Sequence, residues 1–314
     1  MNHALARAPR PSFAPLMRAL VIGASGQVGA ALLHALRSRG HEAYGTHAHN
    51  VAPGLERLDL TDHAAVARAV ASARPDWVFC PAGLSHVDYC EDHPDEAMAA
   101  NRDGPAAAAR AAEAAGAGFV YYSTDYVFDG RGGPFGEDDA PRPLCVYGRS
   151  KHEGERAVLA ACRRAVVIRT SVVYGPERQE KNFVYQLIRA NRAGQGFRLA
   201  VDQKASPSFN PDVAAASVEL GEGDLLGIWH IAGPEVLDRY AFALRICREF
   251  GLDASRLSAV TTAALGQKAP RPLDGGLKVA KAQAQLKTRL RGPDEGLRAM
   301  RGAGAGVDPP QNMK

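Results

Sequence analysis

Short apolar runs alternate with stretches of helical spacing along the first 175 residues of the chain. The apolar runs predict buried strands, and they cover residues 18–23, 76–83, 118–128 (a strand with its exit loop) and 164–175, with a further strand at 41–47. Apolar positions with helical spacing predict helices over residues 27–40, 63–74 and about 95–115. This alternation predicts an α/β fold with a doubly wound parallel sheet, whose ligands bind at the carboxyl ends of the strands.

The alternation weakens after residue 175, although residues 227–233 again read as a strand. We therefore expect a cofactor-binding domain over residues 17–175, to whose sheet the chain returns near 227–233, and a smaller C-terminal lobe, mainly substrate-binding, over 176–300. Residues 1–16 and 301–314 are rich in Pro or Gly and lack apolar periodicity. These two ends are predicted to be a disordered extension and a disordered tail.

Composition narrows the classes of function. The 38 basic and 34 acidic side chains give a net charge of only +4, which is too mild and dispersed for a nucleic-acid-binding surface. No apolar run reaches the roughly 18 residues that a membrane span needs. The five cysteines are odd in number and widely spaced, which favours reduced thiols in a cytoplasmic protein. The ten histidines show no metal-site spacing, so we expect no metal.

A glycine-rich loop, Gly23-Ala-Ser-Gly26-Gln-Val-Gly29, joins the first predicted strand to the first predicted helix. Gly23 permits a tight turn, Gly26 lets a diphosphate approach the backbone, and Gly29 lets the helix pack against the strand. The amino end of that helix offers unpaired N–H groups and a positive dipole end to the anion. The loop predicts a Rossmann-type dinucleotide site.

The second strand and its neighbour bear on which dinucleotide binds. The strand ends Tyr44-Gly45-Thr46-His47, with no carboxylate to repel a 2′-phosphate, so we expect NADP(H) to be preferred and NAD(H) to be possible. Asp59, after the third strand, is a candidate partner for the adenine amino group. Its neighbours have an equally good role in capping the helix that begins near Asp62.

Tyr147 and Lys151 form the chain's single Tyr-x-x-x-Lys pair, and at this spacing both lie on one face of a helix. A lysine cation is expected to lower the tyrosine pKa, so that the phenol can donate a proton to a carbonyl as hydride arrives. Thr124, at the end of a predicted strand, is placed to hydrogen-bond the same carbonyl oxygen. The alternative for the Tyr-Lys pair is an exposed pair on a helix.

Several stretches together give the chain a family resemblance. They are VDYCEDHPDEAMAAN (87–101), YYSTDYVFDG (121–130), EDDAPRPLCVYGRSKHEGE (137–155), VIRTSVVYG (167–175), KNFV (181–184), DQKASPS (202–208) and APRPLDGGL (269–277). With the glycine loop, they resemble the dTDP-4-dehydrorhamnose reductase family of the extended short-chain dehydrogenase/reductases, over about residues 17–300. The resemblance implies reduction of the 4-keto group of a dTDP-linked 6-deoxy sugar to give dTDP-L-rhamnose.

The resemblance also implies roles for individual residues. Tyr147 would be the general acid, Lys151 its modulator and ribose ligand, and Thr124 the partner of the carbonyl oxygen. The implied cofactor-binding residues are Gly23, Ser25, Gly26, Gln27, Val28, Gly29, Asp59, Leu60, Ala82, Gly83, Tyr147 and Lys151. The implied substrate-binding residues are Asp125, Tyr126, Asn182 and Arg271.

Simpler roles stand beside several of these. Asp125 is also suited to capping a turn, Asn182 to capping the helix after it, and Arg271 to a surface ion pair. Asn101 is interpreted as structural, because the superfamily uses an asparagine there to tie a strand to a helix.

The chain departs from the family pattern on the substrate side. Val172 stands where the family commonly has Trp, Pro81 replaces an alanine, and Lys204-Ala-Ser-Pro-Ser replaces a Gly-x-Pro-Thr pattern. Two other functions therefore stay open: a reductase, epimerase or dehydratase of another nucleotide sugar, and an NADP-binding regulatory subunit like that of methionine adenosyltransferase. Thr124-Asp125-Tyr126 argues against a dehydratase, which usually has Asp-Glu after the Thr. Relatives form dimers, so a homodimer is possible.

Overall fold

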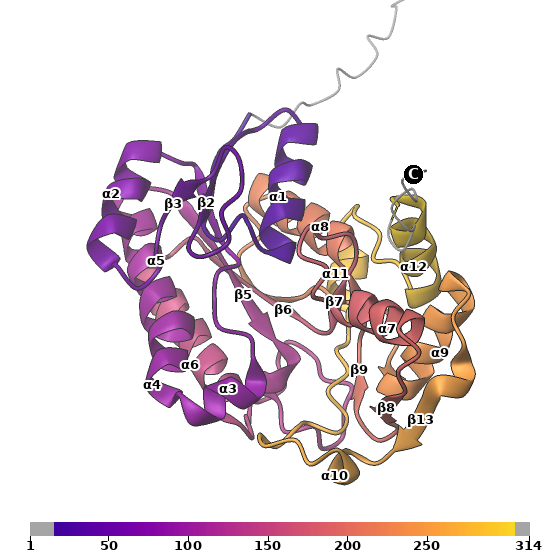
Figure 1. The fold of residues 1–314 in the computed structure, drawn as a ribbon. Coiled ribbons are helices and arrows are strands. Elements are labelled where there is room, and N and C mark those ends of the chain that lie inside the picture. Colours follow the sequence, from indigo (N-terminus) through magenta and orange to yellow (C-terminus); the bar gives the residue numbers. More distant parts are fainter. Residues whose placement is uncertain (1–15, 305–314) are drawn as a thin grey trace, which may run out of the picture.

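A seven-stranded parallel sheet forms the centre of the computed structural model, which describes residues 16–304 (Figure 1). The strand order is β11-β6-β5-β4-β1-β2-β3, and every neighbouring pair is parallel. This sheet confirms the predicted α/β fold. Its strands are β1 (Arg18–Val21), β2 (Glu42–His47), β3 (Glu56–Arg57), β4 (Trp77–Cys80), β5 (Gly118–Thr124), β6 (Ala165–Thr170) and β11 (Gly227–His230).

Helices cover both faces of the sheet. Consecutive residues of a strand point to opposite faces, and both sets are apolar, so each face needs a cover. Val21 and Phe79 lie in one core cluster, with residues of α1 and α8, whereas Leu20 and Val78 lie in a second cluster, with residues of α2, α5 and α6. Burial on both faces is the reason the strands read as continuous apolar runs. The covering helices are α1 (Gln27–Ser38), α2 (His63–Ala73), α5 (Gly104–Ala114), α6 (Val146–Ala161) and α8 (Asn210–Glu222).

The helix predicted over residues 95–115 is interrupted. Helix α4 (Pro94–Met98) leads into a π-helical turn, Ala99–Asp103, before α5 begins. Asn101 lies in that turn, where its Oδ1 accepts from the Leu84 backbone N–H at 2.9 Å and its Nδ2 donates to the Leu84 carbonyl at 2.9 Å. The π turn aims this side chain at the loop after β4, which agrees with its interpretation as structural.

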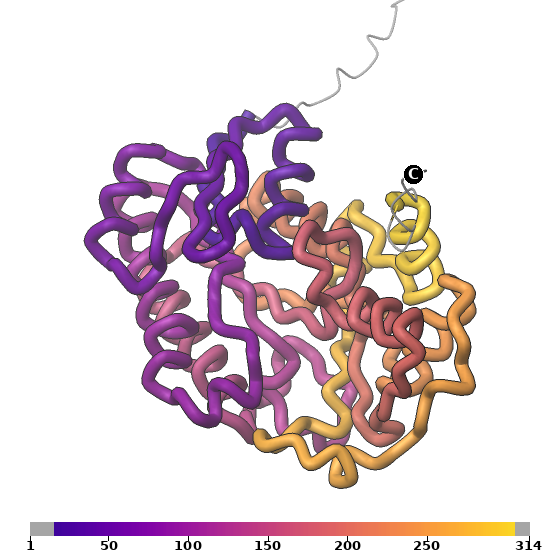
Figure 2. The backbone as a smooth tube through the Cα atoms, in the orientation of Figure 1, coloured from indigo at the N-terminus to yellow at the C-terminus, as the bar shows by residue number. Residues whose placement is uncertain are grey.

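The smaller lobe packs around a separate apolar cluster that includes Leu187, Phe242 and Ile246. Its segments lie together on one side of the molecule, opposite the first 120 residues (Figure 2). The strands and α-helices between β6 and the end of α12 that do not belong to the central sheet or its covering helices are β7 (Val173–Tyr174), α7 (Phe183–Arg192), β8 (Phe197–Ala200), β9 (Lys204–Ala205), β10 (Ser208–Phe209), β12 (Leu237–Asp238), α9 (Arg239–Phe250), β13 (Leu257–Val260), α10 (Thr262–Leu265), α11 (Ala280–Gln285) and α12 (Pro293–Gly302). A further short helix, α3 (Val87–Asp92), follows β4 in the first half of the chain.

The strand predicted over residues 164–175 divides in two. β6 ends at Thr170, and β7 pairs with β10 in a separate small sheet. Between them Val172 has a φ of +42°, a left-handed conformation that a β-branched residue rarely adopts. This turn redirects the chain from the central sheet into the smaller lobe.

The chain re-enters the sheet through β11, which pairs with β6. Lys281, on α11, donates to the Ile228 carbonyl of β11 at 2.7 Å and lies 4.0 Å from the Trp229 ring centroid. At the other end of the structure, α12 reaches Gly302, two residues into the predicted tail. Residues 1–15 and 305–314 of the two predicted disordered ends lie outside the described part. Within residues 16–304, no helix is long and apolar enough to cross a membrane.

Candidate active site

The glycine loop is held in shape by close backbone contacts. Gly23 has a φ of +91°, and a Cβ on it would lie 2.9 Å from the Ala82 Cβ. A Cβ on Gly29 would lie 2.3 Å from the Gly23 carbonyl oxygen, so α1 can start here only with glycine. Gly26 is the N-cap of α1 and gives it no side-chain cap. The amino end of α1 therefore offers backbone N–H groups to an anion.

A cavity of about 540 Å³ opens between this loop, the carboxyl end of the sheet and the smaller lobe. It brings together many of the residues predicted for the cofactor, and Asn182. The predicted residues that line it are Gly23, Gly26, Gln27, Val28, Gly29, Gly83, Tyr147, Lys151 and Asn182.

The residues of this cavity fit a nicotinamide dinucleotide. The Gln27 side-chain Nε2 is buried and has no partner among the described residues, so it is a free donor. A Cβ on Gly83 would lie 2.7 Å from Asn101 Oδ1 and 3.4 Å from Lys151 Nζ, so the chain approaches the lysine closely there. Gly23 and Gly26 would hold the diphosphate, and Lys151 would reach the nicotinamide ribose.

Helix α6 carries Tyr147 and Lys151 and begins at its N-cap Cys145, whose sulfur accepts from the Gly148 N–H at 3.4 Å. Burial lowers the pKa of Lys151 to about 8. Burial also raises the pKa of Tyr147, against a smaller lowering by a hydrogen bond with the Thr124 hydroxyl. The expected net lowering of the Tyr147 pKa is therefore wrong, because desolvation outweighs the effects that lower it. The Lys151 ammonium lies 4.6 Å from the Tyr121 ring centroid. A protonated Tyr147 is nevertheless the form that donates a proton.

Thr124 ends β5, and its hydroxyl caps a single 3-10 turn at Asp125–Val127, within the exit loop predicted after this strand. The hydroxyl accepts from the Tyr126 N–H at 3.2 Å and donates to Asp125 Oδ1 at 3.0 Å. Asp125 also accepts from the Ser171 hydroxyl at 2.5 Å, and burial raises its pKa to about 6. The Tyr126 ring packs edge-on against Tyr147, with centroids 5.5 Å apart. All three predicted residues thus lie next to the phenol, although they do not line the cavity.

Arg271 approaches from the smaller lobe. Its side chain is 8% exposed and pairs with Asp88 at 3.0 Å, so an ion pair forms as the simpler interpretation proposed. Its Nη1, however, is buried without a partner among the described residues, which leaves a donor available to an anionic group. Burial raises the pKa of Tyr126, and the positive charges of Arg239 and, less strongly, Arg271 partly lower it, so Arg271 lies near Tyr126.

Three predicted residues have local structural roles. Asn182 caps α7 by accepting from Val184 N–H at 3.1 Å. Asp59 accepts from the Thr61 N–H at 2.9 Å and hydroxyl at 2.7 Å, and lies outside the cavity lining. Leu60 is buried in the apolar cluster below the sheet. For Asn182 the structure shows the capping role. Helix α2 is capped by Asp62, a neighbour of Asp59, which accepts from the Ala65 N–H at 2.9 Å. Ligand binding by Asn182, Asp59 and Leu60 stays a prediction.

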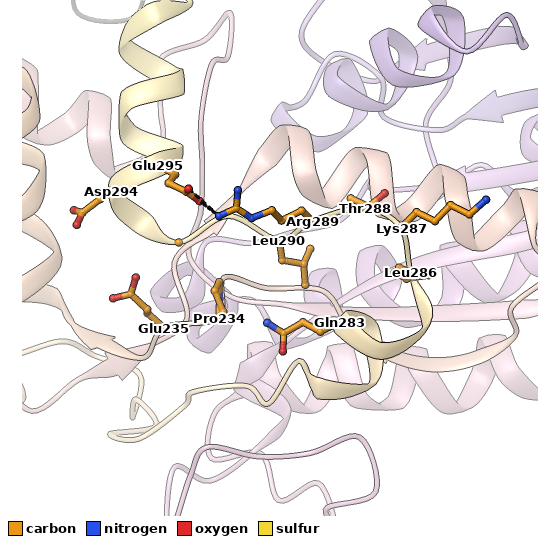
Figure 3. Close-up of a pocket in the computed structure, with 11 residues that line it drawn as sticks. Pro234, Glu235, Gln283, Leu286, Lys287, Thr288, Arg289, Leu290, Asp294 and Glu295 are labelled. Atoms are coloured by element: carbon orange, nitrogen blue, oxygen red, sulfur yellow. Dashed lines mark hydrogen bonds and ion pairs between the residues drawn. The ribbon is translucent and has the colours of Figure 1, made fainter.

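A second cavity, of about 630 Å³, lies between the Pro234–Glu235 turn and the start of α12 (Figure 3). Arg289 and Glu295 pair across its edge at 2.8 Å. None of the predicted site residues lines this cavity. The predicted residues that line a cavity therefore belong to the glycine-loop cavity and not to this one.

Comparison with known proteins gives the family. Residues 17–302 match the model of the RmlD substrate binding domain. The chain belongs to the RmlD family. A dTDP-4-dehydrorhamnose reductase of Streptomyces griseus is 38% identical over 265 residues, which is 82% of this chain and 84% of the relative. The zebrafish methionine adenosyltransferase 2 subunit beta is 33% identical over 278 residues, 86% of this chain and 85% of the relative.

Solved RmlD-family structures share the fold. The dTDP-4-dehydrorhamnose reductase of Bacillus anthracis, solved in complex with NADP, superposes with a TM-score of 0.85 at 27% identity, covering 92% of this chain and 99% of the other. The Clostridium acetobutylicum orthologue gives 0.84 at 29% identity, over 91% and 98%. The Rossmann-type architecture of the chain is therefore that of these reductases.

The RmlD-family match also spans cavity residues that the sequence analysis did not identify. Glu177, Gln179 and Lys181 line the cavity from the segment before Asn182, and Asn50 lines it from the loop after β2. Lys181 lies in the KNFV stretch that carries the family resemblance, although no ligand role was predicted for it. No periodicity or spacing marks the other three positions, because they reach the site only through contacts between distant segments.

Proposed function

We propose that the chain is an NADPH-dependent reductase of the 4-keto group of a nucleotide-activated 6-deoxy sugar, with dTDP-4-dehydro-L-rhamnose as substrate. The observation that carries the proposal is one cavity lined by a dinucleotide-type glycine loop and by Tyr147 and Lys151. Family membership supports an NAD(P)H-dependent oxidoreductase, and the NADP bound to the Bacillus anthracis relative supports NADP as the preferred cofactor. The Streptomyces griseus reductase supports the sugar.

The proposed roles follow from position and charge. Bound NADPH supplies the hydride. Tyr147, protonated at neutral pH, donates its proton to the carbonyl oxygen of the sugar, and Thr124 hydrogen-bonds the same oxygen. The Lys151 ammonium stabilises the phenolate that is left. Asp125 and Tyr126 would contact the sugar nucleotide, and the unpaired donor of Arg271 would meet its diphosphate. In this scheme, residues 17–175 mainly bind cofactor and residues 176–300 mainly bind substrate.

Oxidation of NADPH, followed at the nicotinamide absorbance with enzymatically generated dTDP-4-dehydro-L-rhamnose, tests the proposal. We expect turnover by the wild type and a loss of about 10²- to 10⁴-fold in Tyr147→Phe, with NADPH binding retained. Tight NADPH binding without turnover would contradict this substrate. A panel of other nucleotide-linked keto sugars would then test whether Val172, in place of the family's Trp, admits a different one.

A non-catalytic role is the second candidate, because the zebrafish regulatory subunit is also similar along most of the chain. Under this alternative the chain would bind NADP and a methionine adenosyltransferase catalytic subunit, and would change the activity of that partner. Co-elution of the two proteins distinguishes the candidates. A complex whose activity is the same with wild type and with Tyr147→Phe, combined with no sugar reduction, would favour the regulatory role.

A further inference from the structure

Residues 176–182, called the strap below, join β7 to α7 and face the glycine loop across the cavity. The Gln179 side chain donates from Nε2 to the Ser25 carbonyl at 2.9 Å, a contact between residues 154 positions apart. The strap is therefore attached to the loop that is expected to hold the cofactor diphosphate.

The strap has a defined shape of its own. The Glu177 carboxylate accepts from the Lys181 N–H at 2.7 Å and from the Asn182 N–H. Asn182 in turn donates from Nδ2 to the Gly175 carbonyl at 2.9 Å. Glu180 has a φ of +50°, a left-handed conformation that a non-glycine residue adopts only where its surroundings hold it. These bonds fix where Gln179 and Lys181 point.

A second amide holds the same loop from the other side. Asn210, 1% exposed at the start of α8, donates from Nδ2 to the Gln27 carbonyl at 2.9 Å. The Ser25 and Gln27 carbonyls are thus both bound by side chains from the C-terminal half. With those carbonyls engaged, the N–H groups at the start of α1 remain directed toward an anion.

The charged side chains of the cavity also indicate which strap residue contacts the dinucleotide. Among the residues that line the cavity, the basic side chains are Lys151 and Lys181, and the acidic one is Glu177. Lys151 is buried beside Tyr147, at the reacting end. Glu177 is engaged by the strap backbone. Lys181 is exposed, so it is the remaining cation in the cavity lining that can neutralise the diphosphate of the dinucleotide.

We propose that the strap covers the bound dinucleotide, with Gln179 as the latch that holds the strap on the glycine loop and Lys181 as a ligand of the diphosphate. This inference rests on the cofactor site of the proposed function. Under this proposal Gln179 and Lys181, which lie away from Tyr147, control how fast the cofactor dissociates. The cofactor enters and leaves when the Gln179–Ser25 bond opens.

Stopped-flow release of NADPH, followed by its fluorescence, measures the latch. Gln179→Glu places a carboxylate against the Ser25 carbonyl, so we expect release about three- to tenfold faster, the loss of one hydrogen bond. The matched control is Gln195→Glu, an exposed position in the same lobe, which should release NADPH like the wild type. Equal release rates in the two variants would overturn the latch.

The Lys181 role has its own variant and control. Lys181→Ala should weaken NADP binding and flatten its salt dependence, whereas Lys287→Ala, an exposed lysine on the second cavity, should leave both unchanged. Equal salt dependence in wild type and Lys181→Ala would overturn this role.

Trypsin gives a readout that needs no catalysis. Arg178 is an exposed cleavage site within the strap. NADP should protect Arg178 from cleavage in the wild type and in Gln195→Glu, but much less in Gln179→Glu. If NADP does not change the cleavage rate of the wild type, the strap does not cover the dinucleotide. If the wild type binds and is protected by NADPH but reduces no keto sugar, the strap stands and the proposed function fails. If the wild type does not bind NADPH, both fail.

Discussion

Lys151 is a single residue whose burial sets a pH limit on activity. Its pKa is lowered to about 8, so the ammonium is lost above that pH, and we expect the reductase rate to fall on the alkaline side. Initial rates between pH 6 and 10 measure this alkaline decrease in activity. A rate that is flat to pH 10 would contradict the assigned role of the cation.

The same residue predicts an opposed effect on stability. In the unfolded chain Lys151 regains a pKa near 10.5, so its charge disfavours the fold at neutral pH, and this cost fades as pH rises from about 8 to 10.5. Lys151→Met should therefore raise the free energy of unfolding at pH 7 by on the order of 2 kcal/mol, while abolishing turnover. Denaturant unfolding at pH 7 checks it, and a less stable variant would refute it.

Asp125 gives a second pH effect at the residue scale. Its pKa is raised to about 6, from an ordinary value of 3.8, because it is buried. The folded state then binds the extra proton between those values, so stability should fall as pH rises from about 4 to 6. Asp125→Asn should remove this dependence, whereas Asp129→Asn, at a half-buried position in the loop after the 3-10 turn, should retain it. Thermal unfolding across pH 4–7 compares the three proteins.

At the scale of elements, a buried ion pair joins α6 to β6. Glu155 and Arg169 are each 2% exposed and make two bonds, at 2.9 and 2.7 Å, while the Ser123 hydroxyl donates to the same carboxylate at 2.5 Å. Glu155 lies one turn after Lys151, so this pair fixes the helix that carries the proposed catalytic residues.

Glu155→Gln should destabilise the protein by about 3–5 kcal/mol, because it leaves the Arg169 charge buried and unpaired. The control is Glu113→Gln, which removes the partner of Arg163, a side chain that is 92% exposed; we expect a change within about 1 kcal/mol. Urea unfolding of both variants measures the difference. Similar losses in the two would show that burial does not decide the strength of the pair.

Which elements the sequence could predict depends on whether their causes are local. The glycine loop, the strand–helix alternation and the Tyr147–Lys151 spacing are local patterns, and the structure contains each of them. The interruption of the helix at Asn101 depends on a bond to Leu84, 17 residues away, and the turn at Val172 depends on pairing between β7 and β10. The strap residues reach the cavity through contacts over more than 150 positions, which no short pattern records.

At the scale of the whole molecule, the two parts of the chain share one core. The apolar cluster on one face of the sheet includes Val213 and Leu220 of α8 and Trp229 of β11, which come from beyond residue 175. A fragment of residues 16–175 would expose the β6 edge and this apolar face to water. We expect this fragment to aggregate and the full chain to elute as one defined species. Size-exclusion chromatography with light-scattering detection compares the two. A soluble fragment that unfolds cooperatively would contradict this.

The covered edge strand has a consequence for assembly. Lys281 occupies a carbonyl of β11 and shields Trp229, while the opposite edge, β3, is only two residues long. Neither edge offers the long row of free backbone groups on which a second sheet could grow. If copies of this chain associate, their contact must therefore be made by side chains on helices and loops, and surface substitutions there can tune self-association while the sheet stays intact.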